Sequence, residues 1–178
     1  MGKFDDFKTN LESVAGECYH ATKADAPGVI AGLYKEAGVT TACVYESPFL
    51  KEMGLVDALR EAGVEVHTDH IRKNAETDKG GISEAQYGIA ELGSLIQAQT
   101  DVDGRIVATM SEYYVGILKE SAILDTYDDA FDMLDKMDPI PNFVGIITGP
   151  SRTADIECVG TVGVHGPLRM AAVIIEDA

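Results

Sequence analysis

"APGVIAGLYKEAGVTTACVYESPFLKEMGLVDALREAGVEVHT", residues 26–68, decides the fold class, because two kinds of apolar pattern alternate within it. Residues 26–37 carry apolar side chains at helical spacing and end near a glycine, which predicts a helix. Residues 39–45 are short and rich in β-branched side chains, which is typical of a buried strand. Residues 47–63 predict a second helix and residues 64–68 a second strand. This alternation predicts an α/β fold in which helices cover a sheet.

Residues 1–20 predict an amphipathic helix. Its apolar positions recur at spacings of three and four, as on one face of a helix: Phe4, Phe7, Leu11, Val14 and Cys18. Such a helix can cover the core of its own chain or pair with a second chain. A homo-oligomer and a scaffolding role therefore both remain open.

The second half of the chain predicts more strands than helices. Residues 87–99 are apolar on both sides of a central ELGS, and DVDGR follows at 101–105, so we expect two short strands and an Asp-Gly turn. Residues 123–137 predict an amphipathic helix with its aspartates turned away from the apolar face. Three apolar runs predict buried strands: residues 113–118, 142–147 and 169–176.

Length and composition indicate one globular domain over residues 1–178. Hydrophobic residues make up 46% of the chain and charged residues 25%, so a sizeable core can form. The net charge of −16 argues against binding nucleic acid or an anionic membrane surface, since both need clustered Lys or Arg. No stretch approaches the roughly 20 apolar residues of a membrane helix. We therefore expect a cytoplasmic protein without membrane insertion.

The cysteines and histidines do not form a metal-binding pattern. Cys18, Cys43 and Cys158 are far apart in the sequence, with no zinc or iron–sulfur spacing, so we expect free thiols and no cofactor in this chain. His67 and His70 could ligate a metal, but no carboxylate or thiol pattern completes the site. A solvated strand end is the better interpretation of that pair.

The stretch TGPSRTADIE, residues 148–157, is the strongest candidate for a binding site. It follows an apolar run, breaks at Gly149 and Pro150, and then presents Ser151, Arg152 and Thr153 together. If a helix begins here at the carboxyl end of the sheet, its amide groups favour an anion. Arg152 could then hold a carboxylate or a phosphate through paired hydrogen bonds.

A purely structural interpretation of the same stretch is also open. In that interpretation Ser151 or Thr153 simply caps a turn, and Arg152 pairs with Asp155 three positions later. The scarcity of basic residues favours the binding hypothesis, because only Arg152 and Arg169 follow Lys136.

Two further residues are candidates for proton transfer. His165 lies between glycines in TVGVHGP, residues 161–167, and could act as a proton shuttle or hydrogen-bond donor. The alternative is that the glycines serve only a tight turn with positive φ and that His165 bonds the backbone. Glu91, in the ELGS turn, could be a general base or an ordinary turn carboxylate.

With GPSRTADIE followed by TVGVHGP and an apolar terminal strand, the chain resembles the LUD-domain family of lactate utilization protein C. The resemblance extends upstream to GISEAQYGIAELGSL and is strongest over residues 80–178. It differs at Leu92-Gly93-Ser94, where the family has Thr-Gly-Thr. It also differs after Arg105, where the family has a proline-containing turn.

The resemblance implies a three-layer α/β fold of the sugar-phosphate isomerase and CoA-transferase type. It implies a role in oxidising L-lactate to pyruvate, with iron–sulfur clusters on partner proteins rather than in this chain. Glu91 and His165 are the candidate catalytic residues. The expected ligand-binding residues are Gly93, Ser94, Arg105, Gly149, Pro150, Ser151, Arg152, Thr153, Asp155, His165 and Gly166. A free-standing enzyme acting on a sugar phosphate or an acyl-CoA is the alternative.

Overall fold

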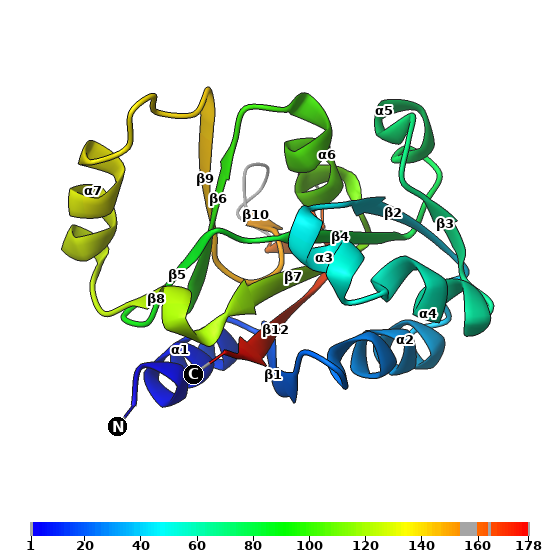
Figure 1. Cartoon of the computed structure of the whole chain (residues 1–178), viewed down its shortest axis with the longest axis horizontal. Coiled ribbons are helices and arrows are strands. Elements are labelled where there is room, and N and C mark those ends of the chain that lie inside the picture. Colours follow the sequence, from blue (N-terminus) through cyan, green and yellow to red (C-terminus); the bar gives the residue numbers. More distant parts are fainter. Residues whose placement is uncertain (1, 154–159, 164, 178) are drawn as a thin grey trace.

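The computed structural model describes residues 2–153, 160–163 and 165–177. In this part of the chain, six parallel strands form a central sheet in the order β1-β12-β7-β4-β2-β3 (Figure 1). Their bounds are β1 Glu17–Thr22, β2 Thr41–Tyr45, β3 Glu65–His67, β4 Gly80–Glu84, β7 Tyr113–Lys119 and β12 Arg169–Glu176. The predicted α/β class is confirmed.

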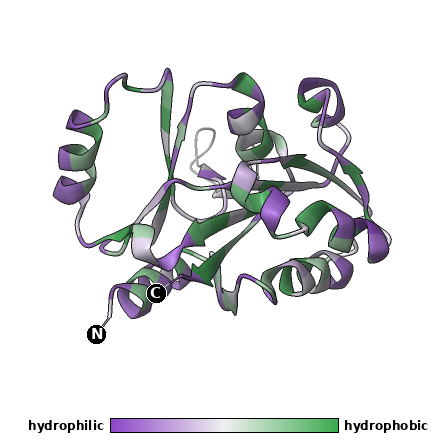
Figure 2. Ribbon diagram, in the orientation of Figure 1, coloured by the Kyte–Doolittle hydropathy of each residue, from purple (hydrophilic) through white to green (hydrophobic). Residues whose placement is uncertain are grey.

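Helices cover both faces of this sheet and make three layers. One face packs against α2 (Ala26–Glu36), α3 (Pro48–Glu52) and α4 (Leu55–Glu61). The other packs against α1 (Lys3–Ser13), α5 (Ile71–Asn74) and α6 (Val102–Met110). Figure 2 shows the strands mostly apolar, with hydrophilic residues on the outer sides of the helices. Burying both faces suits parallel strands, which read as nearly continuous apolar runs.

A second sheet lies beside the first, with the strand order β8-β5-β6-β9. It consists of β5 (Tyr87–Ile89), β6 (Ser94–Gln99), β8 (Ile123–Leu124) and β9 (Phe143–Ile147), and a short 3₁₀ helix at Glu120–Ala122 precedes β8. The amphipathic helix α7 (Tyr127–Asp135) packs on this sheet through Ala130, against Ile89 and Ile96. The predicted strands around ELGS are thus confirmed, whereas the helix predicted over residues 123–137 begins only at Tyr127, because Ile123 and Leu124 form strand β8.

The predicted N-terminal helix is too long. Helix α1 ends at Ser13, and Cys18 lies in strand β1 rather than on the helix stripe. Ala15 has a positive φ of 63°, and a Cβ at Gly16 would lie 2.3 Å from a side-chain carbon of Leu11. The chain therefore turns sharply at this point, and the apolar spacing that continues to Cys18 comes from a buried strand.

Two other predictions were wrong in detail. The helix predicted over residues 47–63 is divided into α3 and α4 at Gly54, which has a φ of 65°. The Asp-Gly turn predicted in DVDGR does not form, because Asp101 caps helix α6 by accepting a hydrogen bond from the backbone N–H of Asp103 at 3.0 Å. Strand β4 was not predicted at all. Neighbouring side chains lie directly against the glycines of this strand, and a Cβ at Gly81 would overlap Ser111 Oγ at 1.8 Å.

None of the helices in the described part of the chain is long and apolar enough to cross a membrane.

Candidate functional site

The residues after strand β9 do not begin a helix. Arg152–Thr153 form strand β10, which pairs antiparallel with β11 (Thr161–Val162). The N–H of Ser151 donates to the carbonyl of Pro167 at 2.9 Å, and the N–H of Gly163 donates to the carbonyl of Ser151 at 2.9 Å. The predicted helix start is therefore wrong for the described residues, because cross-strand bonds use the backbone groups that a helix would have left exposed.

These hydrogen bonds bring the two sequence motifs together. The segments after β9 and before β12 line one cavity of about 300 Å³, a size at the lower end for small-molecule sites. Its walls include Thr148, Gly149, Ser151, Arg152, His165 and Gly166. The sequence thus identified two stretches that meet in space, although they are separated by a segment outside the described residues.

The cavity lies at the amino end of strand β12, not at the carboxyl end of the sheet. His165, Gly166 and Pro167 line it and lead directly into β12, which begins at Arg169. Strand β9 belongs to the second sheet, where it pairs with β6. The predicted position at the carboxyl edge of the central sheet is therefore wrong.

Arg152 is exposed and lies in the cavity wall. Its guanidinium donates a hydrogen bond of 2.9 Å to the carbonyl of Val14, just after helix α1. Within the described residues, no carboxylate forms an ion pair with Arg152. Asp155, its predicted alternative partner, and the side chain of Thr153 lie outside the described part of the structure. Within the described residues, the hydrogen-bond partner of Arg152 is thus a neutral carbonyl group, which positions the positive charge.

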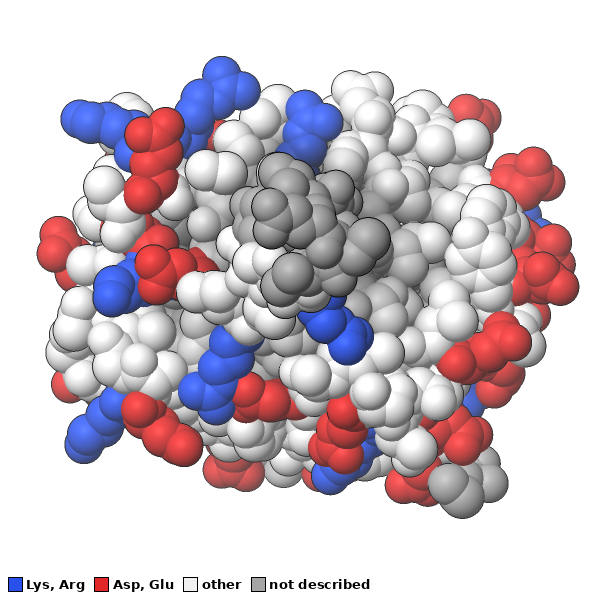
Figure 3. Space-filling view, turned by 180° about the vertical axis from the view of Figure 1, so that it is seen from behind, with Lys and Arg blue, Asp and Glu red and all other residues white. Residues whose placement is uncertain are grey.

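The face of the molecule that carries this segment has a characteristic distribution of charge. Figure 3 shows acidic side chains mainly toward the rim of that face and several lysine and arginine side chains nearer its middle. The net charge of −16 is thus not spread evenly over the surface.

Gly149 and Pro150 are buried and hold the turn against helix α1. Gly149 has a φ of 70°, and a Cβ there would lie 2.7 Å from the carbonyl oxygen of Val14. That close approach and the positive φ both require glycine. The predicted importance of this glycine therefore has a structural cause, whether or not a ligand contacts it.

Gly93, Ser94 and Arg105 were predicted to bind the ligand but do not line the cavity, although Ser94 and Arg105 contact residues that do. The hydroxyl of Ser94 is buried and forms a 2.6 Å hydrogen bond with Thr148, which lines the cavity. Gly93 lies against α1, where a Cβ would be 2.1 Å from the backbone nitrogen of Leu11. The guanidinium carbon of Arg105 lies 5.4 Å from the ring centroid of Phe143, another cavity residue.

Glu91 does not line this cavity. Its carboxylate accepts a 2.9 Å hydrogen bond from the backbone N–H of Tyr127, the first residue of helix α7. A carboxylate at this position accepts from a backbone N–H that has no partner within the helix, and it interacts favourably with the helix dipole. The structure therefore separates the two predicted acid–base residues: His165 is exposed in the cavity wall, and Glu91 caps a helix elsewhere.

Gln97, which was not predicted from the sequence, is 1% exposed and lines the cavity from strand β6. Its side-chain amide donates to the hydroxyl of Ser83 at 2.9 Å and to the carbonyl of Gly104 at 3.0 Å. A polar residue in the apolar run SLIQAQ was the one available signal. Its partners come from β4 and α6, so the network could not be inferred from local pattern.

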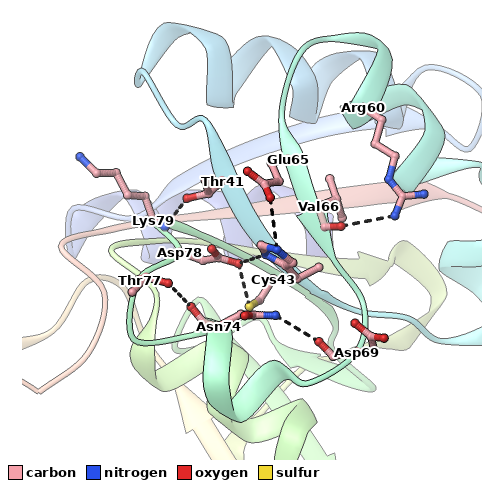
Figure 4. A network of polar contacts seen from close by, with 11 residues as sticks. Thr41, Cys43, Arg60, Glu65, Val66, Asp69, Asn74, Thr77, Asp78 and Lys79 are labelled. Atoms are coloured by element: carbon pink, nitrogen blue, oxygen red, sulfur yellow. Dashed lines mark hydrogen bonds and ion pairs between the residues drawn. The ribbon is translucent and has the colours of Figure 1, made fainter.

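A second polar cluster lies around the buried Asp78 (Figure 4). Asp78 Oδ2 accepts from the Cys43 thiol at 3.1 Å and lies 2.8 Å from Nδ1 of His67. Burial, and then the hydrogen bond to Asp78, raises the pKa of Cys43 far above its ordinary value. The Cys43 thiol and the His67 ring bond the same carboxylate oxygen, and the thiol stays protonated. Cys43 is therefore not an activated nucleophile.

The histidines and cysteines are predicted to form no metal site. Among the described residues, no group of three or more His, Cys, Asp and Glu side chains is arranged to hold a metal ion. His70 is exposed and begins helix α5 with a φ of 50°. The absence of a cofactor stays a prediction, since the third cysteine, Cys158, lies outside the described part.

Comparison with known proteins places these features in a family. The model of the LUD domain matches residues 4–175. YkgG from Escherichia coli is 31% identical over 169 residues, which are 90% of this chain and 73% of YkgG. Lactate utilization protein C from Halalkalibacterium halodurans is 30% identical over 156 residues, 83% of this chain and 68% of that protein.

A crystal structure of a DUF162 family protein from Deinococcus radiodurans has a similar fold. The TM-score is 0.70 at 15% sequence identity, and the superposition covers 97% of this chain and 96% of the other. At that identity the likeness concerns the fold alone. The family match and the 30%-identical relatives show that this chain belongs to the LUD domain family.

Proposed function

We propose that this chain is a component of a lactate-utilisation system and binds a small organic anion in the cavity between β9 and β12. The observation that carries the proposal is the position of Arg152, whose guanidinium lies in the cavity wall with a backbone carbonyl as its described partner. A guanidinium has five N–H donors in a planar fork, which suits a carboxylate. The part of the proposal that concerns lactate rests on the relatives that are named lactate utilization protein C.

The ligand we propose is a short carboxylate. The cavity of about 300 Å³ is polar where Ser151, Arg152 and His165 line it, and apolar where Phe143 and Ile146 line it. A three-carbon acid fits this combination, because its charged end needs donors and its carbon chain needs none. Both L-lactate and pyruvate have this form.

The chemistry of lactate oxidation requires an electron acceptor, which we propose lies on partner proteins with iron–sulfur clusters. This part of the proposal rests on the family resemblance and on the cysteine spacing, which does not match a cluster-binding pattern. In this scheme the chain presents or senses the acid and does not itself transfer electrons. Lactate-dependent dye reduction by the isolated chain would contradict that division of labour.

The anion site is tested by calorimetric titration of the purified chain with L-lactate and with pyruvate. Arg152→Ala should weaken binding about 10- to 100-fold, since a charge-assisted hydrogen bond contributes roughly 1.5–3 kcal/mol. Arg72→Ala is the matched control, because Arg72 is exposed on helix α5 and does not line the cavity. Equal affinities for Arg152→Ala, Arg72→Ala and the unaltered protein would overturn the proposal.

A separate measurement keeps the role of Arg152 apart from stability. Arg152 also bonds Val14, so the alanine variant loses a contact that joins the loop to the end of α1. Arg152→Lys keeps the positive charge but loses the planar fork. We expect Arg152→Lys to bind the acids with intermediate affinity, and unfolding curves of all variants to show whether the fold is intact.

A further inference from the structure

The cavity between β9 and β12 has a polar end and an apolar end, and strand β9 leads from one to the other. Phe143 and Ile147, the first and last residues of this strand, both line the cavity, and Thr148 and Arg152 line it farther along the chain. A strand advances about 3.3 Å per residue, so the lining from Phe143 to Ile147 extends over roughly 13 Å. The hydrogen-bond donors therefore lie beyond the carboxyl end of β9, whereas the apolar lining reaches back to its amino end.

The apolar end is a wall whose position is fixed. Phe143, Gly145 and Ile147 lie on one face of β9, because successive side chains of a strand alternate. The ring of Phe143 lies over Gly145, where a Cβ would be 2.8 Å from a ring carbon. The guanidinium carbon of Arg105, on helix α6, lies 5.4 Å from the centroid of the same ring. Phe143 and Ile147 are only partly buried, so part of their apolar surface stays open to a ligand.

A three-carbon acid leaves this wall largely uncovered. The cavity has a volume of about 300 Å³. Lactate and pyruvate each have six non-hydrogen atoms, and at the roughly 30 Å³ that one water molecule takes in the liquid they fill at most about 180 Å³. At the same allowance, the remaining volume admits about three or four further carbon atoms.

We propose that this cavity prefers small carboxylic acids whose apolar chain is longer than the methyl group of lactate, up to about six carbons in all. The inference rests on the proposed anion site and adds the class of acid that the site prefers. In this arrangement the carboxylate contacts Arg152, and the carbon chain runs along β9 against Ile147 and Phe143. Each further methylene group that leaves water for this wall raises the affinity about fourfold.

The chain that fits is a hydrocarbon and not a hydroxylated chain such as that of a sugar acid. Two polar side chains lie near the apolar wall: Gln97, which is opposite Gly145 in the strand pairing, and Thr109 on helix α6. Both use their donor groups on partners within the protein. Hydroxyl groups placed against Phe143 and Ile147 would therefore lose water without gaining a donor, which is unfavourable.

The test is a calorimetric titration of the whole chain with L-lactate and with the L-2-hydroxy acids of four, five and six carbons. All four acids share one head group, so they differ only in the number of methylene groups. We expect the affinity to rise about fourfold per methylene, which amounts to about 60-fold from lactate to 2-hydroxyhexanoate.

Two variants assign this increase to the wall. Phe143→Ala should reduce the increase to less than about twofold per methylene and leave the affinity for lactate within about twofold of the unaltered protein. Phe131→Ala is the matched control, because Phe131 is exposed on helix α7 and does not line the cavity, and it should keep the full increase. Arg152→Ala should weaken the binding of every acid by a similar factor and keep the increase per methylene, since charge and chain contact different ends of the cavity.

Each outcome separates this inference from the proposed function beneath it. Equal affinities for all four acids in the unaltered protein would overturn the inference and leave the anion site standing. An undiminished increase in folded Phe143→Ala would also overturn it, because the chain would then contact another surface. If none of the acids binds, the anion site itself fails. The series in the unaltered protein decides the matter even if Phe143→Ala does not fold.

Discussion

The guanidinium of Arg152 donates a 2.9 Å hydrogen bond to the carbonyl of Val14, a residue 138 positions earlier in the chain. The contact joins the wall of the cavity to the turn between helix α1 and strand β1. The same carbonyl is the nearest atom to the place where a Cβ on Gly149 would be. The end of α1 therefore fixes both the arginine and the turn that presents it.

Gly149→Ala should destabilise the fold by about 1–3 kcal/mol. Alanine would have to adopt a φ of 70°, and its Cβ would lie 2.7 Å from the carbonyl oxygen of Val14. Urea unfolding measures the change. Gly28→Ala on helix α2 is the control, because a Cβ there meets nothing within 4 Å, and it should leave stability unchanged or slightly raised. A loss of the same size in both variants would contradict this account of Gly149.

The ion pair between Glu17 and Arg169, which joins the amino ends of β1 and β12, predicts a pH-dependent stability. Burial alone would raise the pKa of Glu17, but hydrogen bonds from Arg169 and Tyr19 outweigh it and lower the net pKa below 4.5. A carboxyl group with a lowered folded pKa stabilises the protein above its unfolded pKa, and this contribution is lost as the pH falls through the folded value.

Glu17→Gln should therefore be less stable than the unaltered protein near pH 7, and the difference should shrink below about pH 4.5 as Glu17 becomes protonated. Chemical unfolding at a series of pH values measures the difference. Glu61→Gln, on the exposed side of α4, serves as the control. A difference that stays constant from pH 7 to pH 3 would show that the ion pair does not act as described.

Glu91→Ala should cost about 0.5–1 kcal/mol of stability and leave anion binding unchanged. The carboxylate of Glu91 accepts from the backbone N–H of Tyr127 at 2.9 Å. Removing the carboxylate leaves this N–H, at the start of α7, without its acceptor. Glu91→Gln, which keeps an acceptor oxygen, should recover part of the stability. Loss of anion binding in a folded Glu91→Gln variant would instead restore the catalytic hypothesis for this residue.

Cys18 and Cys43 should react slowly with a thiol reagent at pH 8 in the folded protein. Burial raises the pKa of Cys18 to about 12 and that of Cys43 further, so both remain protonated. Only the thiolate attacks such reagents, and roughly one Cys18 in 10⁴ would be ionised at that pH. Peptide mapping after timed labelling follows each residue separately. Fast labelling of either cysteine before unfolding would contradict the burial that the structure assigns to them.

The sequence predicted the parts of the fold that depend on local pattern. The alternation over residues 26–68 identified two strands and their helices, and the limits of strand β12 matched the apolar run RMAAVIIE. The prediction failed where a neighbour decides the conformation. Cys18 continues the spacing of α1 but lies in a strand. Gly80 and Gly81 belong to a strand because β4 pairs with β2 and β7, and the neighbouring side chains leave room only for glycine there.

The candidate site was predictable only in part, for the same physical reason. The motifs around Arg152 and His165 are contiguous in sequence, so their composition identified them. Gln97 depends on donor bonds to Ser83 and Gly104, 14 and 7 positions away, and no local pattern reveals them. Glu91 was assigned a catalytic role on its residue type and its motif alone, whereas its hydrogen bond to α7 depends on the path of the chain 36 positions later.

The central claim is that a small carboxylate binds between β9 and β12, and mapping of backbone amide shifts by NMR during titration with L-lactate tests it most directly. The account predicts that the largest shifts occur at Gln97, Thr148, Ser151 and His165, which line one cavity. Shifts concentrated instead around Glu84 and Lys119, at the carboxyl ends of β4 and β7, would place the ligand in a different cavity and contradict the claim. The absence of any shift at saturating lactate would contradict it equally.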